Sequence, residues 1–199
     1  MPLYISQHAQ TFPATTGLAV ANIAGGVGVV GGQPVPNDPT VVRVVYQSAG
    51  GGFGQNFLDM IVNHTAPNPI VLFGVSDTFV LPNGTPITSE FGWTTWPSLP
   101  NLPSAGEVIR MFVDVTECSG VKYCVCAAGG NPTAFPVHAL LVHELSHARQ
   151  AVDGTFNLAN TEPLAIADEN GYRSQRAILP LRDPTLYGDP SCTGCGKCP

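Results

Sequence analysis

The sequence predicts an α+β fold, in which a small mixed or antiparallel sheet comes first in the chain and two helices follow. The first 117 residues contain several short stretches rich in β-branched residues, which are typical of strands. Two longer amphipathic patterns follow after residue 135 and are typical of helices. With 199 residues, 22 Gly and 19 Pro, the chain is long enough for one packed domain and favours turns over a helical bundle.

The composition divides the chain into three parts. Residues 1–40 carry little charge and much Gly, Pro and Thr, which predicts a loop-rich N-terminal segment. We expect residues 41–190 to form the folded domain and residues 191–199 to form a cysteine-rich tail. The stretch GVGVVG at 26–31 matches a dinucleotide-binding fingerprint, but the prolines that begin at Pro34 exclude the helix that such a site requires.

The first part of the domain is expected to hold most of the strands. TVVRVVYQS (40–48) and EVIRMFVDVTE (107–117) are predicted strands, and PIVLFGVSDTFVL (69–81) is a predicted strand or strand pair. QNFLDMIVNH (55–64) has apolar residues at helical spacing. EFGWTTWPSLPNLP (90–103) is rich in aromatic residues and proline, which predicts a surface loop packed by its tryptophans.

The two later helices are defined by the residues at their ends. Pro136 suits the first turn of the first helix, and Asp153 with Gly154 ends it. Thr161 is the expected N-cap of the second helix, which should run to about residue 178. The first helix has a buried apolar stripe at positions 137, 140, 141, 145, 148 and 152.

His143, Glu144 and His147 in the first helix form the pattern H-E-x-x-H. Histidines four residues apart project from one helical face and are close enough to share a cation. Glu144 is rotated by about 100° from His143, so it can reach a metal-bound water without ligating the metal. Zinc lowers the pKa of such a water to about 7, so the pattern favours a zinc hydrolase. The alternative is an amphipathic helix that carries two histidines incidentally.

A zinc hydrolase needs a third protein ligand, which the second helix can supply. Glu162 and Glu169 share one face of that helix, whereas Asp168 is rotated away. A helix–loop–helix can bring either glutamate to the histidines, and the spacing leaves both open. His138 lies nearly opposite His147 around the first helix, so we do not expect it to be a ligand.

Four short motifs in this region carry a family resemblance. They are HELSHA at 143–148, E-x-x-A at Glu162, E-N-x-x-R from Glu169 to Arg173, and L-P-L-R at 179–182. Over about residues 138–188 the chain resembles the M91-type effector metallopeptidases, a group of zincins among bacterial effector proteins.

The resemblance implies a zincin-like fold, with an active-site helix and a second helix that bears a ligand. It implies Zn2+ as the cofactor, bound by His143, His147 and Glu162, with Glu169 as the alternative third ligand. Glu169, Asn170 and Arg173 could instead orient the histidines or the helix pair. By analogy with zincins, the strand at 107–117 would line the cleft as an edge strand and pair with an extended peptide.

The predicted function is that of a zinc metallopeptidase, in which Glu144 activates a zinc-bound water that attacks a peptide bond. Arg173, Tyr172 and Tyr187 are the candidates for stabilising the oxyanion. The resemblance implies a bacterial effector or toxin that acts on a protein or peptide substrate. Two alternatives are a zincin-fold hydrolase that acts on a small molecule, and a non-enzymatic cysteine-rich module.

The charge balance limits the expected partners. The 8 basic and 14 acidic residues give a net charge of −6, which argues against nucleic acid and anionic membranes. The first arginine is Arg43, so no basic residue precedes an apolar segment, and the apolar stretch at 17–32 is short and Gly-rich. We therefore expect a soluble protein, either cytoplasmic or exported without a typical secretion signal.

Six cysteines form two groups, and the sequence leaves their state open. An even number permits disulfides, while the spacing in CTGCGKC also suits zinc or part of an iron–sulfur cluster. Free thiols are the third possibility. The cysteines are Cys118, Cys124, Cys126, Cys192, Cys195 and Cys198.

Overall fold

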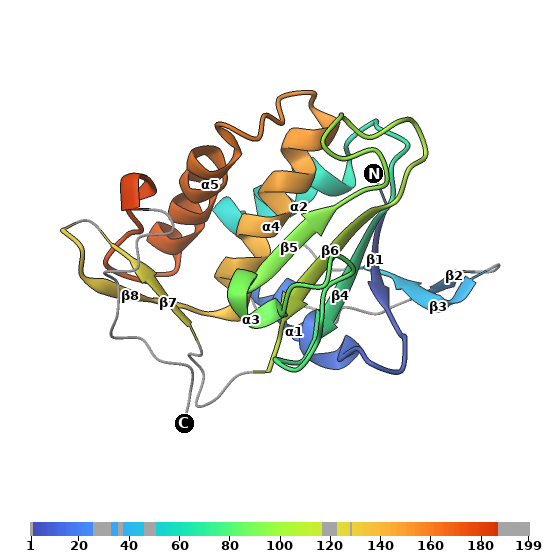
Figure 1. Ribbon diagram of the computed structural model, residues 1–199, viewed down its shortest axis with the longest axis horizontal. Coiled ribbons are helices and arrows are strands. Elements are labelled where there is room, and N and C mark those ends of the chain that lie inside the picture. Colours follow the sequence, from blue (N-terminus) through green and yellow to red (C-terminus); the bar gives the residue numbers. More distant parts are fainter. Residues whose placement is uncertain are drawn as a thin grey trace.

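The computed structural model describes residues 2–25, 33–35, 38–45, 51–116, 123–127 and 129–186. It has the predicted α+β class, with a six-stranded mixed sheet, a separate two-stranded hairpin and helices beside them (Figure 1). The helices are α1 (Pro13–Ile23), α2 (Phe53–Val62), α3 (Ile87–Glu90), α4 (Val137–Val152) and α5 (Thr161–Gln175), with a short 3-10 helix at Pro184–Leu186. The strands are β1 (Leu3–Ser6), β2 (Gln33–Val35), β3 (Asp38–Arg43), β4 (Ile70–Val75), β5 (Gly92–Thr95), β6 (Ile109–Asp114), β7 (Tyr123–Cys126) and β8 (Pro132–Phe135).

The large sheet has the strand order β2-β3-β1-β4-β6-β5. Strands β1, β4 and β6 are parallel to one another, whereas β3 and β5 pair in the antiparallel direction. The predicted strand at 107–117 is confirmed as β6, but it is an inner strand and does not lie at the edge. The edge strand beside β6 is β5, which falls within the segment 90–103 that was expected to be a loop. Its pairing with β6 supplies the backbone hydrogen bonds that the local sequence does not reveal.

The N-terminal residues are part of the sheet, which corrects the expected loop-rich segment at 1–40. The strand β1 lies between β3 and β4 near the middle of the sheet, and Leu3 and Ile5 are buried. The helix α1 begins at Pro13, a residue whose fixed φ suits the first turn, and packs against α4. The GVGVVG stretch at 26–31 lies outside the described residues.

Helices α1 and α4 cover one face of the sheet, whereas Ile87 of the short helix α3 packs on the other. Ile109, Met111 and Val113 of β6 belong to the main core beneath α1 and α4, as their alternation along the strand requires. Phe112 faces the opposite side, where it stacks on Phe73 with ring centroids 4.8 Å apart. In Figure 1, α5 lies beside α4 on the helical side of the molecule, and the two helices pack against each other.

Helix α4 is the central helix of the fold. It has 16 residues, of which 13 are buried, because neighbours surround it on almost every side. Its packing partners include α1, α5, β5 and β6. The polar side chains of this helix are therefore inside the protein and must find polar partners there. Among the described residues, no helix combines the length and apolar character needed to cross a membrane.

The β7–β8 hairpin contains two of the six cysteines. Cys124 and Cys126 are both disulfide-bonded, which confirms the disulfide alternative for these two residues. The other four cysteines lie outside the described residues. The hairpin continues into the segment after α5, because Ala127 pairs with Arg182 and the Asp183 amide donates to the Cys126 carbonyl at 2.9 Å.

His138 lies in the first turn of α4, as expected for a helix-start histidine, and is half-buried. Its Nδ1 atom lies 3.0 Å from the Tyr172 hydroxyl, and the two rings meet edge to face at 5.6 Å. Burial, assisted by the charges of Arg176 and Arg173, lowers the pKa of His138 to about 4 from its usual 6.5.

The low pKa of His138 predicts a loss of stability in acid. The unfolded chain binds a proton near pH 6.5 and the folded chain only near 4, so this contribution is complete above pH 6.5 and disappears as the pH falls to about 4. The loss should amount to up to about 3 kcal/mol. Urea unfolding of wild type and His138→Gln across this pH range measures it. An equal pH dependence in both proteins would contradict the prediction.

Candidate metal centre

Three residues of α4 form a buried cluster that could hold a metal ion. His143, Glu144 and His147 are 4%, 4% and 7% exposed, and they offer ligand atoms within 4.8 Å of one another. Both histidines point their Nε2 atoms inward, 3.2 Å apart, as expected for residues one helical turn apart.

Glu162 in the first turn of α5 brings a carboxylate to the same point. Its Oε2 atom lies 3.1 Å from Nε2 of His143, and its Oε1 atom lies 3.3 Å from Nε2 of His147. Ligand atoms about 2.0–2.1 Å from a tetrahedral zinc ion are separated by about 3.3 Å. The donor set and its spacing therefore fit a small cation bound by two imidazoles and one carboxylate.

Glu162 and Glu144 play different parts at the centre, and Glu162 fits a ligand better than Glu144. Glu162 touches both Nε2 atoms, and its side chain is 25% exposed, so one side of the site is open. The Oε2 atom of Glu144 instead accepts a hydrogen bond from the Thr94 hydroxyl at 2.7 Å. Glu144 thus stands beside the cluster, held by the edge strand β5.

The outer nitrogen of each histidine also has a partner. Nδ1 of His143 lies 3.1 Å from Oε2 of Glu169, and Nδ1 of His147 lies 2.7 Å from the Thr161 hydroxyl. Such contacts fix the ring orientation and leave the inner nitrogen free to bind a cation. Glu169 therefore lies on the opposite side of His143 from Glu162, which does not fit its alternative role as third ligand. The Thr161 side chain does not cap α5 either; the helix has Asn160 at the N-cap without a side-chain hydrogen bond.

Glu169 is a fully buried carboxylate between two arginines. Its Oε1 atom accepts from Nε of Arg173 at 2.5 Å, and its Oε2 atom accepts from Arg182 at 2.8 Å. Burial raises the pKa of Glu169, but the contact with His143 and the two guanidinium charges outweigh it and lower the pKa to about 2. Glu169 is thus an ionised acceptor for the outer nitrogen of His143.

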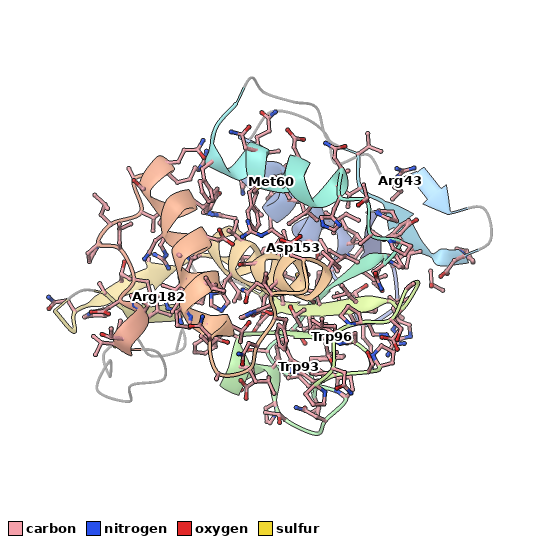
Figure 2. All side chains as sticks on the ribbon, turned by 90° about the horizontal axis from the view of Figure 1, so that it is seen from above. Arg43, Met60, Trp93, Trp96, Asp153 and Arg182 are labelled. Carbon is pink, nitrogen blue, oxygen red and sulfur yellow. The ribbon has the colours of Figure 1, made fainter. Side chains whose placement is uncertain are left out.

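Asn170 of the E-N-x-x-R motif and Arg182 of the L-P-L-R motif are bound to each other in the structure. The Asn170 amide group donates to the Arg182 carbonyl at 2.8 Å and accepts from the Arg182 amide at 2.9 Å, as a neighbouring strand would. The L-P-L-R segment at 179–182 is thereby attached to α5. In Figure 2, Arg182 lies beside α5 on the side of the molecule that carries the hairpin.

The protonation of the centre follows from its mixture of charges. Burial disfavours a charged His143, but the carboxylates of Glu162 and Glu169 outweigh burial and raise its pKa to about 9. Burial likewise disfavours an ionised Glu162, and the two histidines more than compensate, so its pKa is lowered. The carboxylates favour a positive charge at this point, which is the charge that a cation supplies.

Glu144 has the environment of a general base. Burial raises its pKa, and the nearby histidines and the Thr94 hydroxyl oppose this shift only in part. The side chain fits because Gly92 on β5 has none of its own. A Cβ atom at position 92 would lie 2.6 Å from Oε1 of Glu144, which is too close for any real contact.

Gly92→Ala should therefore displace Glu144 without touching the metal-binding side chains. We expect a loss of any hydrolytic activity of at least about tenfold, because a carboxylate moved by 1 Å no longer meets its substrate correctly. Metal content should stay unchanged. Thr95→Ala, on the opposite face of the same strand, is the control and should keep its activity. Full activity of Gly92→Ala would contradict the prediction, because it would show that the position of Glu144 does not depend on the absence of a side chain at residue 92.

Of the three predicted oxyanion-stabilising residues, Tyr172 and Arg173 have other partners in the structure. Tyr172 is fully buried, and its hydroxyl contacts His138 and the Asn22 carbonyl oxygen. Arg173 is also fully buried and binds Glu169 and the Ala134 carbonyl, so it supports the centre from behind. Tyr187 lies outside the described residues.

Asp168 is turned away from the centre, as its position on the helix predicted. It accepts a hydrogen bond from the Ser146 hydroxyl at 2.5 Å and lies 3.3 Å from Arg149. The Thr94 hydroxyl, which the sequence did not single out, is a group that does reach the site.

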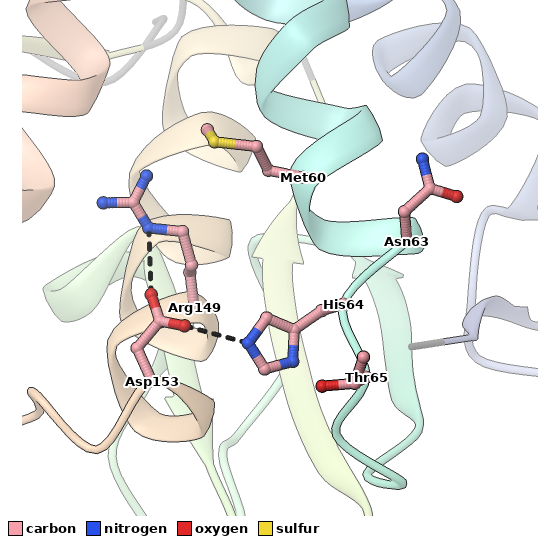
Figure 3. A pocket seen from close by; sticks show the side chains of 6 residues that line it. All are labelled: Met60, Asn63, His64, Thr65, Arg149 and Asp153. Carbon is pink, nitrogen blue, oxygen red and sulfur yellow. Dashed lines mark hydrogen bonds and ion pairs between the residues drawn. The ribbon is translucent and has the colours of Figure 1, made fainter.

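A separate pocket of about 450 Å³ lies between α2 and the C-terminal end of α4 (Figure 3). Its charged groups are paired with one another, since Asp153 accepts from His64 at 2.9 Å and lies 3.7 Å from Nε of Arg149. The residues of the candidate metal centre do not line this pocket. It is lined by Met60, Asn63, His64, Thr65, Arg149 and Asp153.

Comparisons of the chain with protein-family models, with curated proteins and with solved structures find no match.

Proposed function

We propose that this protein is a zinc-dependent peptidase with a zincin-like arrangement of active-site helix, ligand-bearing helix and edge strand. One observation carries the proposal: the inner nitrogens of His143 and His147 and the carboxylate of Glu162 converge with tetrahedral spacing, while a fourth residue, Glu144, stands beside them. Two imidazoles and a carboxylate form a donor set typical of catalytic zinc. The resemblance to M91-type metallopeptidases agrees with this reading.

His143, His147 and Glu162 would hold the zinc ion. When bound, the ion supplies a Lewis acid that polarises a carbonyl and lowers the pKa of a water molecule to about 7. Glu144 accepts the proton of the attacking water and returns it to the leaving amine. The raised pKa of Glu144 suits both accepting and returning the proton. The Thr94 hydroxyl donates to the Glu144 carboxylate and holds it in place.

The edge strand β5 offers a binding place for an extended peptide. Its neighbour on one side is β6, and within the described residues no strand pairs with its other side. Backbone groups on a free edge can add a peptide as a further strand, with affinity from main-chain hydrogen bonds. Since Thr94 on this strand touches Glu144, a peptide paired with β5 would pass next to the base.

Metal analysis tests the binding part of the proposal. Purified protein should contain one zinc per chain, and His147→Ala should lose it. His64→Gln changes a histidine outside the centre and should retain the zinc. A variant without cysteines separates the centre from any metal held by thiols, and it too should retain the zinc. Loss of all zinc with the cysteines would contradict the proposal.

A peptide library tests the chemistry. Zinc-loaded protein should cleave at least some extended peptides, and chelation should stop the cleavage. A correctly folded, zinc-loaded protein that ignores peptides and hydrolyses amide or ester metabolites would support a small-molecule hydrolase in its place.

A further inference from the structure

We infer that Arg182 is a positioning residue of the metal centre, acting on His143 through Glu169. This inference rests on the proposed zinc site but adds a residue from outside the two helices that form it. Arg182 follows α5 in the chain and forms a β-bridge with Ala127, next to the β7–β8 hairpin.

The two oxygens of Glu169 have separate partners. Oε1 is bound by Arg173, whereas Oε2 is shared by Arg182 at 2.8 Å and Nδ1 of His143 at 3.1 Å. Arg182 therefore holds the same oxygen that receives the histidine. With Nδ1 held against this oxygen, Nε2 of His143 is the nitrogen that faces the metal position and that a cation would occupy in place of a proton.

Arg182 is held more firmly than an ordinary surface arginine. It is 8% exposed, and the Asn170 side chain binds both its amide and its carbonyl. Its guanidinium lies 5.1 Å from the centre of the Phe135 ring, which itself meets His143 edge to face at 6.3 Å. An arginine fixed in this way can determine where a carboxylate stands.

The buried carboxylate of Glu169 is stabilised by Arg182 as well as by Arg173. Glu169 is 0% exposed and carries a negative charge next to a ligand of the metal. The guanidinium of Arg182 lies 3.4 Å from Nδ1 of His143, and both nitrogens meet at Oε2 of Glu169, so this oxygen is the group that keeps the two cationic donors together. Without Arg182, Arg173 alone would draw the carboxylate towards its own side, away from Nδ1.

Zinc affinity tests the inference, measured by competition with a chromophoric chelator. Arg182→Met should weaken zinc binding by about 10–100-fold, the effect expected when the partner of a ligating histidine is disturbed. Arg182→Lys keeps the charge without the planar fork and should weaken binding less. Arg149→Met is the matched control: this arginine pairs with Asp153 and Asp168 beside the pocket of Figure 3, and its loss should leave zinc affinity unchanged.

A double-mutant cycle separates positioning from general damage. If Arg182 acts through Glu169, the effect of Arg182→Met on zinc affinity should largely vanish in a Glu169→Gln background. The visible spectrum of the cobalt-substituted protein should change in Arg182→Met and stay as in wild type in Arg149→Met. Circular dichroism of the metal-free proteins reports folding, and Arg182→Lys carries the test if Arg182→Met does not fold.

Three outcomes would overturn the inference. Unchanged zinc affinity in both folded Arg182 variants, or additive effects in the cycle, would overturn it while leaving the zinc site intact. A folded wild type that binds no zinc would overturn the proposed function, and the positioning role with it.

Discussion

Glu144→Gln should abolish peptide hydrolysis while leaving zinc bound. The amide keeps the shape of the side chain and can still meet the Thr94 hydroxyl, but it cannot accept a proton from water. Loss of a general base typically costs about 10²–10⁴-fold in rate. The proposed zinc ligands His143, His147 and Glu162 are unchanged, so metal content should equal that of wild type.

The rate of cleavage of the best library peptide and the zinc content of the same sample measure this result. Glu90→Gln is a suitable control, because Glu90 is an exposed glutamate in α3, outside the centre. Activity within a few-fold of wild type in Glu144→Gln would exclude the base role. Loss of zinc together with activity would mean that Glu144 is itself a ligand.

Glu169→Gln should give the largest loss of stability of the substitutions considered. Its carboxylate is the ionic partner of two buried arginines, Arg173 and Arg182, which are 0% and 8% exposed. Removing one member of a buried ion pair leaves charge without compensation, which costs about 3–5 kcal/mol. Among the described residues, Nη2 of Arg173 already has no hydrogen-bond partner, so the loss of Glu169 would leave this guanidinium with the Ala134 carbonyl as its remaining acceptor in that part of the chain.

Urea unfolding of the metal-free proteins measures this cost, with Glu162→Gln as the matched control. Glu162 is on the same helix but has a 25% exposed side chain, and within the part of the chain that the structure describes its ion pairs are with His143 and His147. Its replacement should abolish zinc binding and change the free energy of unfolding much less. Equal losses of stability in Glu162→Gln and Glu169→Gln would contradict the assignment of Glu162 as a metal ligand and Glu169 as a buried ion-pair partner.

Local patterns predicted the parts of the fold that depend on neighbours in sequence. The apolar stripe with Pro136 before it and Gly154 after it predicted α4 almost to the residue, because helix ends and faces depend on short-range contacts. Residues 107–117 predicted β6 in the same way. Residues 90–103 did not reveal β5, and residues 1–40 did not reveal β1, since both strands depend on partners distant in the chain.

The sequence predicted the helix that carries the candidate metal centre, and it left the third ligand open between Glu162 and Glu169. The H-E-x-x-H spacing places two imidazoles on one helical face whatever surrounds it, and the resemblance indicated Glu162 from the second helix. The tertiary structure decided which nitrogen of His143 each glutamate meets, because that depends on how α4 and α5 pack together. It also placed Tyr172 in the core, Thr94 beside Glu144 and Arg182 behind Glu169. No local pattern carries this information, because each contact joins segments that only the folded chain brings together.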